Sequence, residues 1–388
     1  MTGGSSNSRH VLLVEPRTEG HHLTWLRYIA EDLLSAGFQV SAATRDQPPT
    51  RSLIAEAMGE VHSHLGQFAL SPGILSSQAG LREIAQIAEQ AGAGEIFFNS
   101  FDEIASDSLR KAAFGLLPPA PMRDRTSGIY FRPRFLQNHF SASHWLKRAG
   151  LRRLQRRQFF NRLLLLDDRL IPNARTHFPA GRFTFLPDPY PANFEGDRLA
   201  ARRNLELEMS RRVFLFYGGP YRRKGMHLAA EAFQQLGAAS PALLLYAGQP
   251  PEDSNLLMQL RNLEERGAAR LLLRRVSDSE ERLLFAAADF VLLPYVGHFG
   301  SSGVLSRAAG ASRPVIASDE ELVGHLARQY ELGLLFPTGN SAALKQAIAT
   351  ALSSDARTVA KWEENARRFA ASCSREAFRT ALLESFKA

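Results

Sequence analysis

Two short stretches in the second half of the chain combine the residue types that bind phosphate. The first, residues 218–225, reads Gly-Gly-Pro-Tyr-Arg-Arg-Lys-Gly, and the second, residues 297–304, reads Gly-His-Phe-Gly-Ser-Ser-Gly-Val. Each follows an apolar run that predicts a buried strand and precedes a pattern that predicts a helix. Helix-start amides together with a cation form an anion site. We therefore predict that the two turns hold one diphosphate from two sides.

The first turn supplies the cations. We expect Lys224 at the start of the following helix, joined there by Arg222 or Arg223. Gly219 leaves room for a ligand or backbone to approach, because it has no Cβ atom. The order of residues is not that of a P-loop. Taken alone, the turn is equally consistent with a basic surface loop.

The second turn supplies amides. Ser301 or Ser302 is expected to cap the helix that follows. The amides of Ser302, Gly303 and Val304 would then form the phosphate cradle. Capping alone also explains a serine at this place. Arg307 lies one helical turn further on and points either at the diphosphate or at solvent.

Polar residues at other strand ends are the remaining candidates for chemistry. His298, beside Gly300, and His21, at the start of the first helix, are the candidate catalytic residues. A histidine at a helix start is more often structural. The candidates for contact with an acceptor are Gly20, His22, Asn99 and Arg132. No motif predicts a metal site.

The elements that must position these residues alternate between strand and helix. Strands are expected at residues 10–15, 39–44 and 95–99 in the first half, with helices at 22–36, 81–91 and 106–115. After the rigid, proline-rich residues 186–191, the alternation begins again at 213–217 and continues to 315–317. This order predicts an α/β protein with two doubly wound parallel sheets, whose ligands lie beyond the carboxyl ends of the strands.

The composition limits the class of protein. A chain of 388 residues with 45% hydrophobic residues accommodates two globular domains. The apolar runs are too short for a membrane-spanning helix. The single cysteine, Cys373, cannot form an internal disulfide, so a cytoplasmic location is the simplest interpretation.

The net charge of +8 is concentrated in residues 125–166, which contain no Asp or Glu. Aromatic and leucine residues are interleaved with the cations. This pattern suits peripheral binding to an anionic membrane surface, at the inner face of the membrane. It is equally consistent with an Arg-rich helix packed on its own domain. No nucleic-acid motif is present, so nucleic acid is not an expected partner.

The second half also resembles the nucleotide-sugar domain of the group 1 (family 4) GT-B glycosyltransferases. That family shows G-R-x-x-x-x-K-G after a strand, and residues 218–225 correspond to it, with Lys224 at the family's lysine. Residues 288–295 and 313–318 match the family's A-D-x-x-x-x-P-S and G-x-P-V-I-A-S patterns in part. The resemblance is specific over residues 204–350 and weaker in the first half.

The resemblance implies a GT-B fold of two Rossmann-like domains facing a central cleft. It implies an acceptor-side domain at 1–192, a donor domain at 193–370, and a terminal helix at 371–388 that crosses back onto the first domain. The implied activity is transfer of a sugar from a nucleotide sugar to an unidentified acceptor, with retention of configuration and without metal or cofactor. The alternatives are a nucleotide-sugar epimerase or hydrolase and a non-catalytic GT-B module that binds a partner.

One departure from the family concerns its E-x7-E glutamates. Aligned backwards from Pro314, the first position falls on Phe299 and the second on Arg307. In the family the second glutamate contacts the donor ribose, and the first lies near the sugar. The departure therefore indicates either different donor contacts or a lost activity.

Overall fold

The computed structural model describes residues 9–18, 22–45, 48–137, 141–179, 181–191, 194–237 and 240–387. The chain divides into two compact units. Unit 1 comprises Met1–Leu186 and Arg379–Ala388, and unit 2 comprises Pro187–Phe378. The expected boundary at 192 lies six residues after Leu186. The expected boundary at 370 lies eight residues before Phe378.

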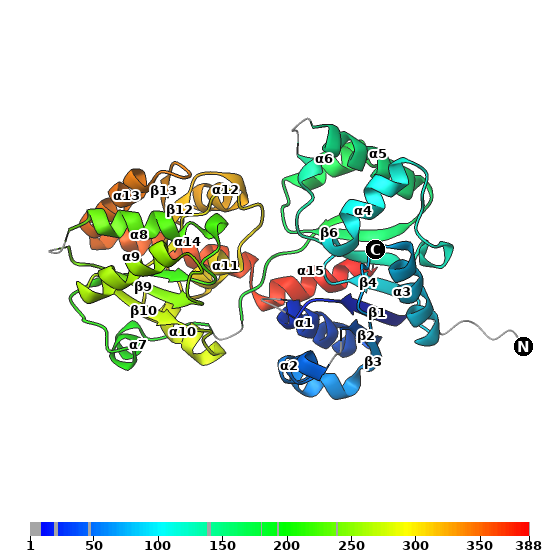
Figure 1. Cartoon of the computed structure of the whole chain (residues 1–388), viewed down its shortest axis with the longest axis horizontal. Helices are drawn as coiled ribbons and strands as arrows, with labels where there is room; N and C mark the ends of the chain where they lie inside the picture. The colour runs from blue at the N-terminus through cyan, green and yellow to red at the C-terminus, as the bar shows by residue number, and fades with distance from the viewer. Residues whose placement is uncertain are drawn as a thin grey trace, which may run out of the picture. The chain divides into compact units, whose positions relative to one another are not determined.

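Unit 1 is built on a parallel sheet of seven strands in the order β3-β2-β1-β4-β5-β6-β7 (Figure 1). The strands are β1 (His10–Glu15), β2 (Gln39–Thr44), β3 (Gly66–Ala69), β4 (Glu95–Phe98), β5 (Thr126–Tyr130), β6 (Phe160–Leu165) and β7 (Phe183–Phe185). The α-helices are α1 (His22–Ser35), α2 (Pro48–Met58), α3 (Gln78–Gln90), α4 (Asp102–Ala113), α5 (Ala142–Arg156) and α6 (Leu170–His177). The direction of strand addition reverses between β1 and β4, so the carboxyl ends of these two strands form a topological switch point.

Unit 2 repeats this plan with six parallel strands in the order β10-β9-β8-β11-β12-β13. The strands are β8 (Arg212–Tyr217), β9 (Ala242–Gly248), β10 (Ala269–Leu273), β11 (Phe290–Leu293), β12 (Val315–Ser318) and β13 (Gly333–Phe336). The helices are α7 (Arg198–Asn204), α8 (Met226–Gln235), α9 (Ser254–Glu265), α10 (Asp278–Ala287), α11 (Gly303–Gly310), α12 (Glu321–Gln329), α13 (Ser341–Ser353) and α14 (Ala356–Ser372). Here the switch point lies between β8 and β11.

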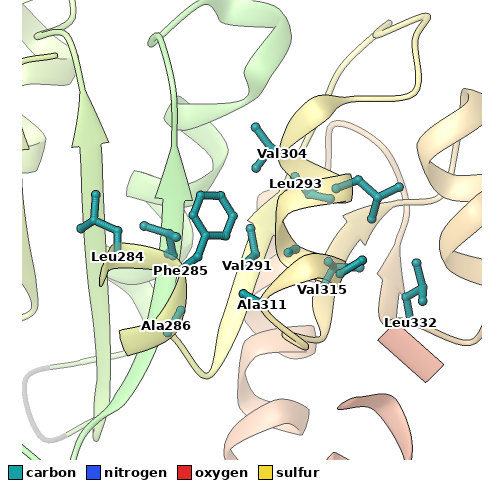
Figure 2. Packing of buried hydrophobic residues seen from close by; sticks show 14 of the residues in the cluster. Leu284, Phe285, Ala286, Val291, Leu293, Val304, Ala311, Val315 and Leu332 are labelled. Carbon is teal, nitrogen blue, oxygen red and sulfur yellow. The ribbon is translucent and has the colours of Figure 1, made fainter. Parts of the chain in front are cut away.

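Both faces of the unit 2 sheet are buried. Residues of α8, α9 and α13 pack on one face, and residues of α7, α10, α11 and α12 pack on the other. Figure 2 shows side chains of α10, β11 and α11 packed together on the face that α7, α10, α11 and α12 cover, with Phe285 beside Val291. Because each strand contacts helices on both sides, the strands are apolar throughout, which explains the short hydrophobic runs in the sequence.

The last helix, α15 (Arg375–Lys387), runs into unit 1. Arg379 approaches Asp32 of α1 with 3.8 Å between their side-chain nitrogen and oxygen atoms. Phe386 stacks on Phe97 of β4 at 5.8 Å between ring centroids. The C-terminal segment therefore contributes to the core of the first unit.

The basic segment 125–166 is an Arg-rich helix only in part. Helix α5 fits that interpretation, whereas Thr126–Tyr130 and Phe160–Leu165 are adjacent, largely buried strands. The first of these strands, β5, lies in the interior of the sheet. Its β-branched and aromatic residues favour a buried strand.

None of the helices in the described part of the chain is long and apolar enough to cross a membrane.

Candidate functional site

The two glycine-rich turns of unit 2 touch each other. They follow β8 and β11, which are hydrogen-bonded neighbours with Phe214 opposite Phe290. The amide of Val296, in the second turn, donates a hydrogen bond of 2.9 Å to the carbonyl oxygen of Arg223 in the first. The parallel pairing thus brings the two turns together at one edge of the sheet.

Gly225 allows the first turn to pack this closely. Its φ of +74° lies in the left-handed region, where side chains are strained. A Cβ atom at this position would also overlap the carbonyl oxygen of Pro294. Only glycine fits both the backbone conformation and the contact, so the turn that carries Lys224 is held against the end of β11.

Lys224 begins a chain of hydrogen bonds across the two turns. Its Nζ atom donates to the Tyr295 hydroxyl at 2.8 Å and lies 4.4 Å from the centre of that ring. The Tyr295 hydroxyl lies 2.9 Å from Ser302 Oγ. Tyr295 therefore connects the predicted cation to the predicted amide cradle. The sequence analysis missed it, although a tyrosine directly after the strand-ending Pro294 was a signal.

His298 lies in the same group of side chains. Its Nδ1 atom is 2.8 Å from an Arg223 guanidinium nitrogen, and its ring centroid is 4.6 Å from that of Tyr295. The other two predicted residues of the first turn are more peripheral. Arg222 is exposed, and Gly219 lies beneath the ring of Tyr221, which a Cβ atom would displace. The catalytic role of His298 stays a prediction.

The second turn differs from a capped helix start. Ser302 occupies the N-cap position of α11 with a φ of +64°, and its hydroxyl bonds Tyr295 instead of capping the helix. Ser301 does not cap either, because its hydroxyl donates to Asp188 Oδ2 at 2.6 Å. Ser302 is thus the N-cap residue, as predicted for one of the two serines, but neither serine caps α11 with its side chain. The amides of Gly303 and Val304, in the first turn of the helix, have no intrahelical acceptor by helix geometry.

Asp188 is a buried carboxyl group that the sequence analysis did not identify. Burial raises its pKa, while the Ser301 hydrogen bond and the charges of Arg307 and Lys224 act in the opposite direction. Asp188 lies on the proline-rich segment at the start of unit 2. Its carboxylate is thus near the position where the turns would hold an anion.

Arg307 points neither at solvent nor at an open site. Its Nε atom is 2.7 Å from Glu281 Oε1 on α10, and its Nη1 atom donates to the carbonyl oxygen of Gly303 at 3.0 Å. Burial and the adjacent Glu281 raise the pKa of Tyr217, which completes this group. A buried ion pair therefore stands where the family comparison expected a ribose-binding glutamate.

Unit 1 places a different group at its own switch point. Glu15, at the end of β1, is buried and lies 2.8 Å from His22 Nδ1. The side-chain amide of Asn99, after β4, donates to Glu15 and to the carbonyl oxygen of His22 at 3.0 Å. The structure therefore unites two predicted acceptor-side residues around a carboxylate that sequence reasoning missed. Gly20 and His21 lie outside the described residues.

Arg132 is further along the same edge. Its backbone amide and that of Phe131 donate to the two oxygens of Asp102, at 3.1 and 2.7 Å. Burial raises the pKa of Asp102 to about 6. The Arg132 side chain is exposed, so the structure provides it with no fixed contact of the kind that Asn99 has.

Within the described ranges, no group of three or more His, Cys, Asp or Glu side chains has the spacing to hold a metal ion.

Comparisons with known proteins agree with this arrangement. Residues 197–369 match the family model of the glycosyl transferases group 1. A phosphatidyl-myo-inositol mannosyltransferase of Mycobacterium leprae is 32% identical over 151 residues, which cover 38% of this chain. The match spans about two fifths of that relative's length, 39%.

Two solved structures match nearly the whole chain. HepE of Anabaena, in complex with UDP, has a TM-score of 0.70 and 17% identity, covering 97% of this chain and 99% of HepE. Sucrose-phosphate synthase of Thermosynechococcus elongatus has a TM-score of 0.71 and 17% identity, covering 98% of each chain. These likenesses identify the two Rossmann-like units as a GT-B fold. Residues 197–369 are therefore similar to the group 1 glycosyl transferases, and the whole chain shares the fold of these two structures.

Proposed function

We propose that the chain is a glycosyltransferase that takes a sugar from a nucleoside diphosphate sugar and transfers it to an acceptor. The observation that carries the proposal is the contact between the two turns of unit 2. The hydrogen bond from Val296 to Arg223 places Lys224 and the start of α11 side by side. A cation and free helix-start amides are the groups that a departing diphosphate requires.

The proposed mechanism is electrostatic. Negative charge grows on the β-phosphate as the glycosidic bond to the donor breaks. Lys224 would stabilise that charge, and Tyr295 would hold the ammonium group in place through its 2.8 Å hydrogen bond. The amides of Gly303 and Val304 would receive the phosphate oxygens. Such preorganised donors cost no rearrangement during the reaction. We extend the family resemblance to propose retention of configuration and no metal requirement.

The acceptor side of the proposal rests on unit 1. The buried Glu15 and Asn99 and the half-buried His22 form a polar group at the ends of β1 and β4. Ligands of open α/β sheets bind at such ends. We propose that this group orients the acceptor or the transferred sugar, and that His21 and His298 are the residues to test for proton transfer.

The related proteins support a nucleotide-sugar donor. HepE is described in complexes with UDP and with UDP-glucose. The Mycobacterium leprae relative is a mannosyltransferase. These descriptions leave open which base and sugar this chain uses, so the first experiment screens UDP, GDP, ADP and dTDP sugars.

The experiment measures nucleoside diphosphate release by chromatography for each donor, with wild type and the Lys224→Ala variant. Removing an oxyanion-stabilising donor typically costs about 10²–10³ in kcat. We expect a loss of this size for Lys224→Ala. Lys361→Ala is the matched control, because Lys361 forms an exposed ion pair with Glu331 on another surface of unit 2. Equal turnover of wild type and Lys224→Ala would refute the assignment of the diphosphate site.

A non-catalytic binding module is the second candidate function. It is favoured by Arg307, which stands where the family has a glutamate. Arg307 forms an ion pair with Glu281. Calorimetry distinguishes the two candidates, since a module that has lost its donor site produces no heat with any nucleotide sugar. An epimerase or hydrolase is recognised in the same assay by turnover that needs no acceptor.

We further propose that unit 1 docks on anionic membranes through α5 and the end of α4. Trp145 is 61% exposed on α5, and Phe114 is 75% exposed directly after α4. Arg152, Arg156 and Arg157 are exposed nearby in sequence, a combination that suits an anionic bilayer. Other cations of the segment are committed elsewhere, since Arg148 donates to backbone carbonyl oxygens.

Sedimentation with vesicles tests the docking proposal. We expect wild type to bind vesicles containing phosphatidylglycerol more strongly than phosphatidylcholine vesicles, and Trp145→Ala to weaken that binding severalfold. Met258→Ala, at an exposed position of α9 in unit 2, is the control. Equal partitioning onto both kinds of vesicle would contradict the proposal.

A further inference from the structure

A polar pocket opens in unit 1 at the carboxyl ends of β1, β2 and β4. Its volume is about 400 Å³, and it is lined by Pro16, Arg17, Arg45 and Glu103. These residues come from three separate segments of the chain. Pro16 and Arg17 follow β1, Arg45 follows β2, and Glu103 lies in the first turn of α4, the helix after β4. None of them is used in the proposed mechanism.

Arg17 is held in a defined position. Its Nη2 atom is 2.7 Å from Glu103 Oε1, and its backbone amide donates to Glu15 Oε1 at 2.8 Å. The side chain remains 53% exposed, so the guanidinium group is accessible to a ligand. An arginine fork has five N–H donors, and one carboxylate contact leaves most of them available.

Arg45 approaches from the end of β2. Its Nη2 atom donates to the carbonyl oxygen of Gly73 at 2.6 Å, which fixes the guanidinium group. Its Nε–H is buried and has no hydrogen-bond partner among the residues that the structure describes. A buried donor left without an acceptor costs free energy, and a bound anion would remove that cost.

The charge of the pocket favours an anion. Two guanidinium groups face one carboxylate, so the lining carries a net positive charge. Helices α1 and α4 both begin at this edge of the sheet, and their N-termini add to the positive potential. Glu103, in contrast, accepts hydrogen bonds from hydroxyl groups. A ligand with one phosphate and neighbouring hydroxyls matches both features.

We propose that this pocket binds the phosphate ester of a hydroxylated acceptor. Arg17 and Arg45 would hold the phosphate oxygens, and Glu103 would accept a hydroxyl of the same molecule. The identification of the ligand as an acceptor rests on the proposed glycosyltransferase function, whereas the anion site itself rests on the pocket alone. The volume is sufficient for a small polyol phosphate.

The test is calorimetry with glycerol 3-phosphate as the probe and glycerol as the uncharged comparison. All titrations use the Lys224→Ala background, in which the cation of the donor turn is absent. We expect Arg17→Ala and Arg45→Gln each to weaken glycerol 3-phosphate binding at least tenfold. Arg123→Ala is the matched control, because Arg123 is exposed before β5, at the opposite ends of the strands.

Unchanged binding in both arginine variants, or equal binding of glycerol, would overturn the proposal. Arg17→Ala keeps the test valid if Arg45→Gln disturbs folding, which circular dichroism monitors, since Arg17 forms only an exposed ion pair. A parallel titration with dihexanoylphosphatidylglycerol identifies the source of the phosphate. Tighter binding of that lipid assigns the pocket to lipid head groups, and tighter binding of glycerol 3-phosphate assigns it to free phosphate esters.

Donor-dependent nucleotide release, measured on the same arginine variants without the Lys224 change, separates this proposal from the proposed function. Release that falls with the loss of phosphate binding, while the affinity for the nucleotide sugar stays at the wild-type value, assigns the pocket to the acceptor and leaves the donor site intact. Release that stays at the wild-type value would show that the bound phosphate ester is not the acceptor. If no donor is turned over by any variant, the glycosyltransferase proposal fails, but the phosphate titration still decides whether the pocket binds an anion.

Discussion

The two switch points of this protein share a topology and differ in chemistry. At the β8/β11 edge, Lys224, Tyr295 and Ser302 are joined by hydrogen bonds across two turns that touch. At the β1/β4 edge, Glu15 and Asn99 form a buried acidic group beside a basic pocket. Parallel sheets place strand ends and helix starts together in both cases. The residues directly after each strand then decide what the edge can bind, which is why the shared fold does not by itself imply a shared function.

The difference also concerns rigidity. In unit 2 the turns are locked by Gly225 against Pro294 and by the backbone hydrogen bond between Val296 and Arg223. In unit 1 the basic residues Arg17 and Arg45 reach the pocket from separate loops. A donor site that must stabilise growing charge benefits from fixed groups.

The strongest test of this comparison is Gly225→Ala. The new Cβ atom would meet the Pro294 carbonyl oxygen at a positive φ, so strain and overlap combine. We expect a loss of about 4 kcal/mol in the free energy of unfolding, measured with urea. Gly92→Ala in unit 1 is the control, because its φ of +67° carries strain but a Cβ atom there meets nothing within 4 Å. A loss no larger than that of Gly92→Ala would show that the turns are not locked together.

The next test compares ion pairs in the two units. Arg307→Ala leaves the buried Glu281 without its cation, so we expect a loss of about 3 kcal/mol in the free energy of unfolding. Arg17→Ala breaks the more exposed pair with Glu103 and should cost less than about 1 kcal/mol. Thermal and urea unfolding measure both. Similar losses in the two variants would remove the distinction between a structural and an available arginine.

The third test concerns Asp102 in unit 1 and the pH dependence of stability. Burial raises its pKa to about 6 in the folded state, above the value of 3.8 for an ordinary aspartate. The folded state therefore binds more protons between these values, and this group's contribution to stability is present below pH 4 and lost as pH rises through 6. In the wild type we expect this group to lower the free energy of unfolding by about 1–3 kcal/mol across this range. We expect Asp102→Asn to remove that fall. Urea unfolding of both proteins at pH 4.5 and 7 measures it, and identical pH profiles would contradict the assignment.

The smallest effect concerns Ser302. Ser302→Ala removes the hydrogen bond to Tyr295 and keeps the unfavourable φ of +64°, so it should cost about 1 kcal/mol. Ser302→Gly removes the same bond but relieves the backbone strain, so it should be nearly neutral. Chemical unfolding of the two variants separates these contributions. An equal cost for both would mean that the positive φ stores no strain.

Much of the donor side followed from local patterns. The sequence was sufficient to predict the glycine-rich turns, the cations at 222–224 and the helix start at Gly303. Each of these features lies within a few residues of an apolar run. The N-cap position of α11 was also predicted, but neither serine caps the helix with its side chain. Serine is a favoured cap, but here tertiary partners, Asp188 and Tyr295, compete successfully for the two hydroxyls.

Less of the acceptor side could be predicted from the sequence. His22 and Asn99 were identified by their places at element ends, whereas Glu15 looked like the last residue of a strand. Arg17, Arg45 and Glu103 had no shared pattern at all. Their common pocket depends on β2, β1 and β4 being neighbours in that order, which no local periodicity specifies.

The sequence by itself determined the alternation of strands and helices, the two glycine-rich turns and the cations that they carry. Those features depend on periodicity and on the conformational limits of glycine and proline, which act over a few residues. Only the tertiary structure decided which side chains meet. Lys224 and Tyr295 are 71 residues apart, Arg307 and Glu281 are 26 apart, and Ser301 and Asp188 are 113 apart. Such contacts are set by strand order and helix packing, because these bring together ends of elements that the chain itself keeps distant.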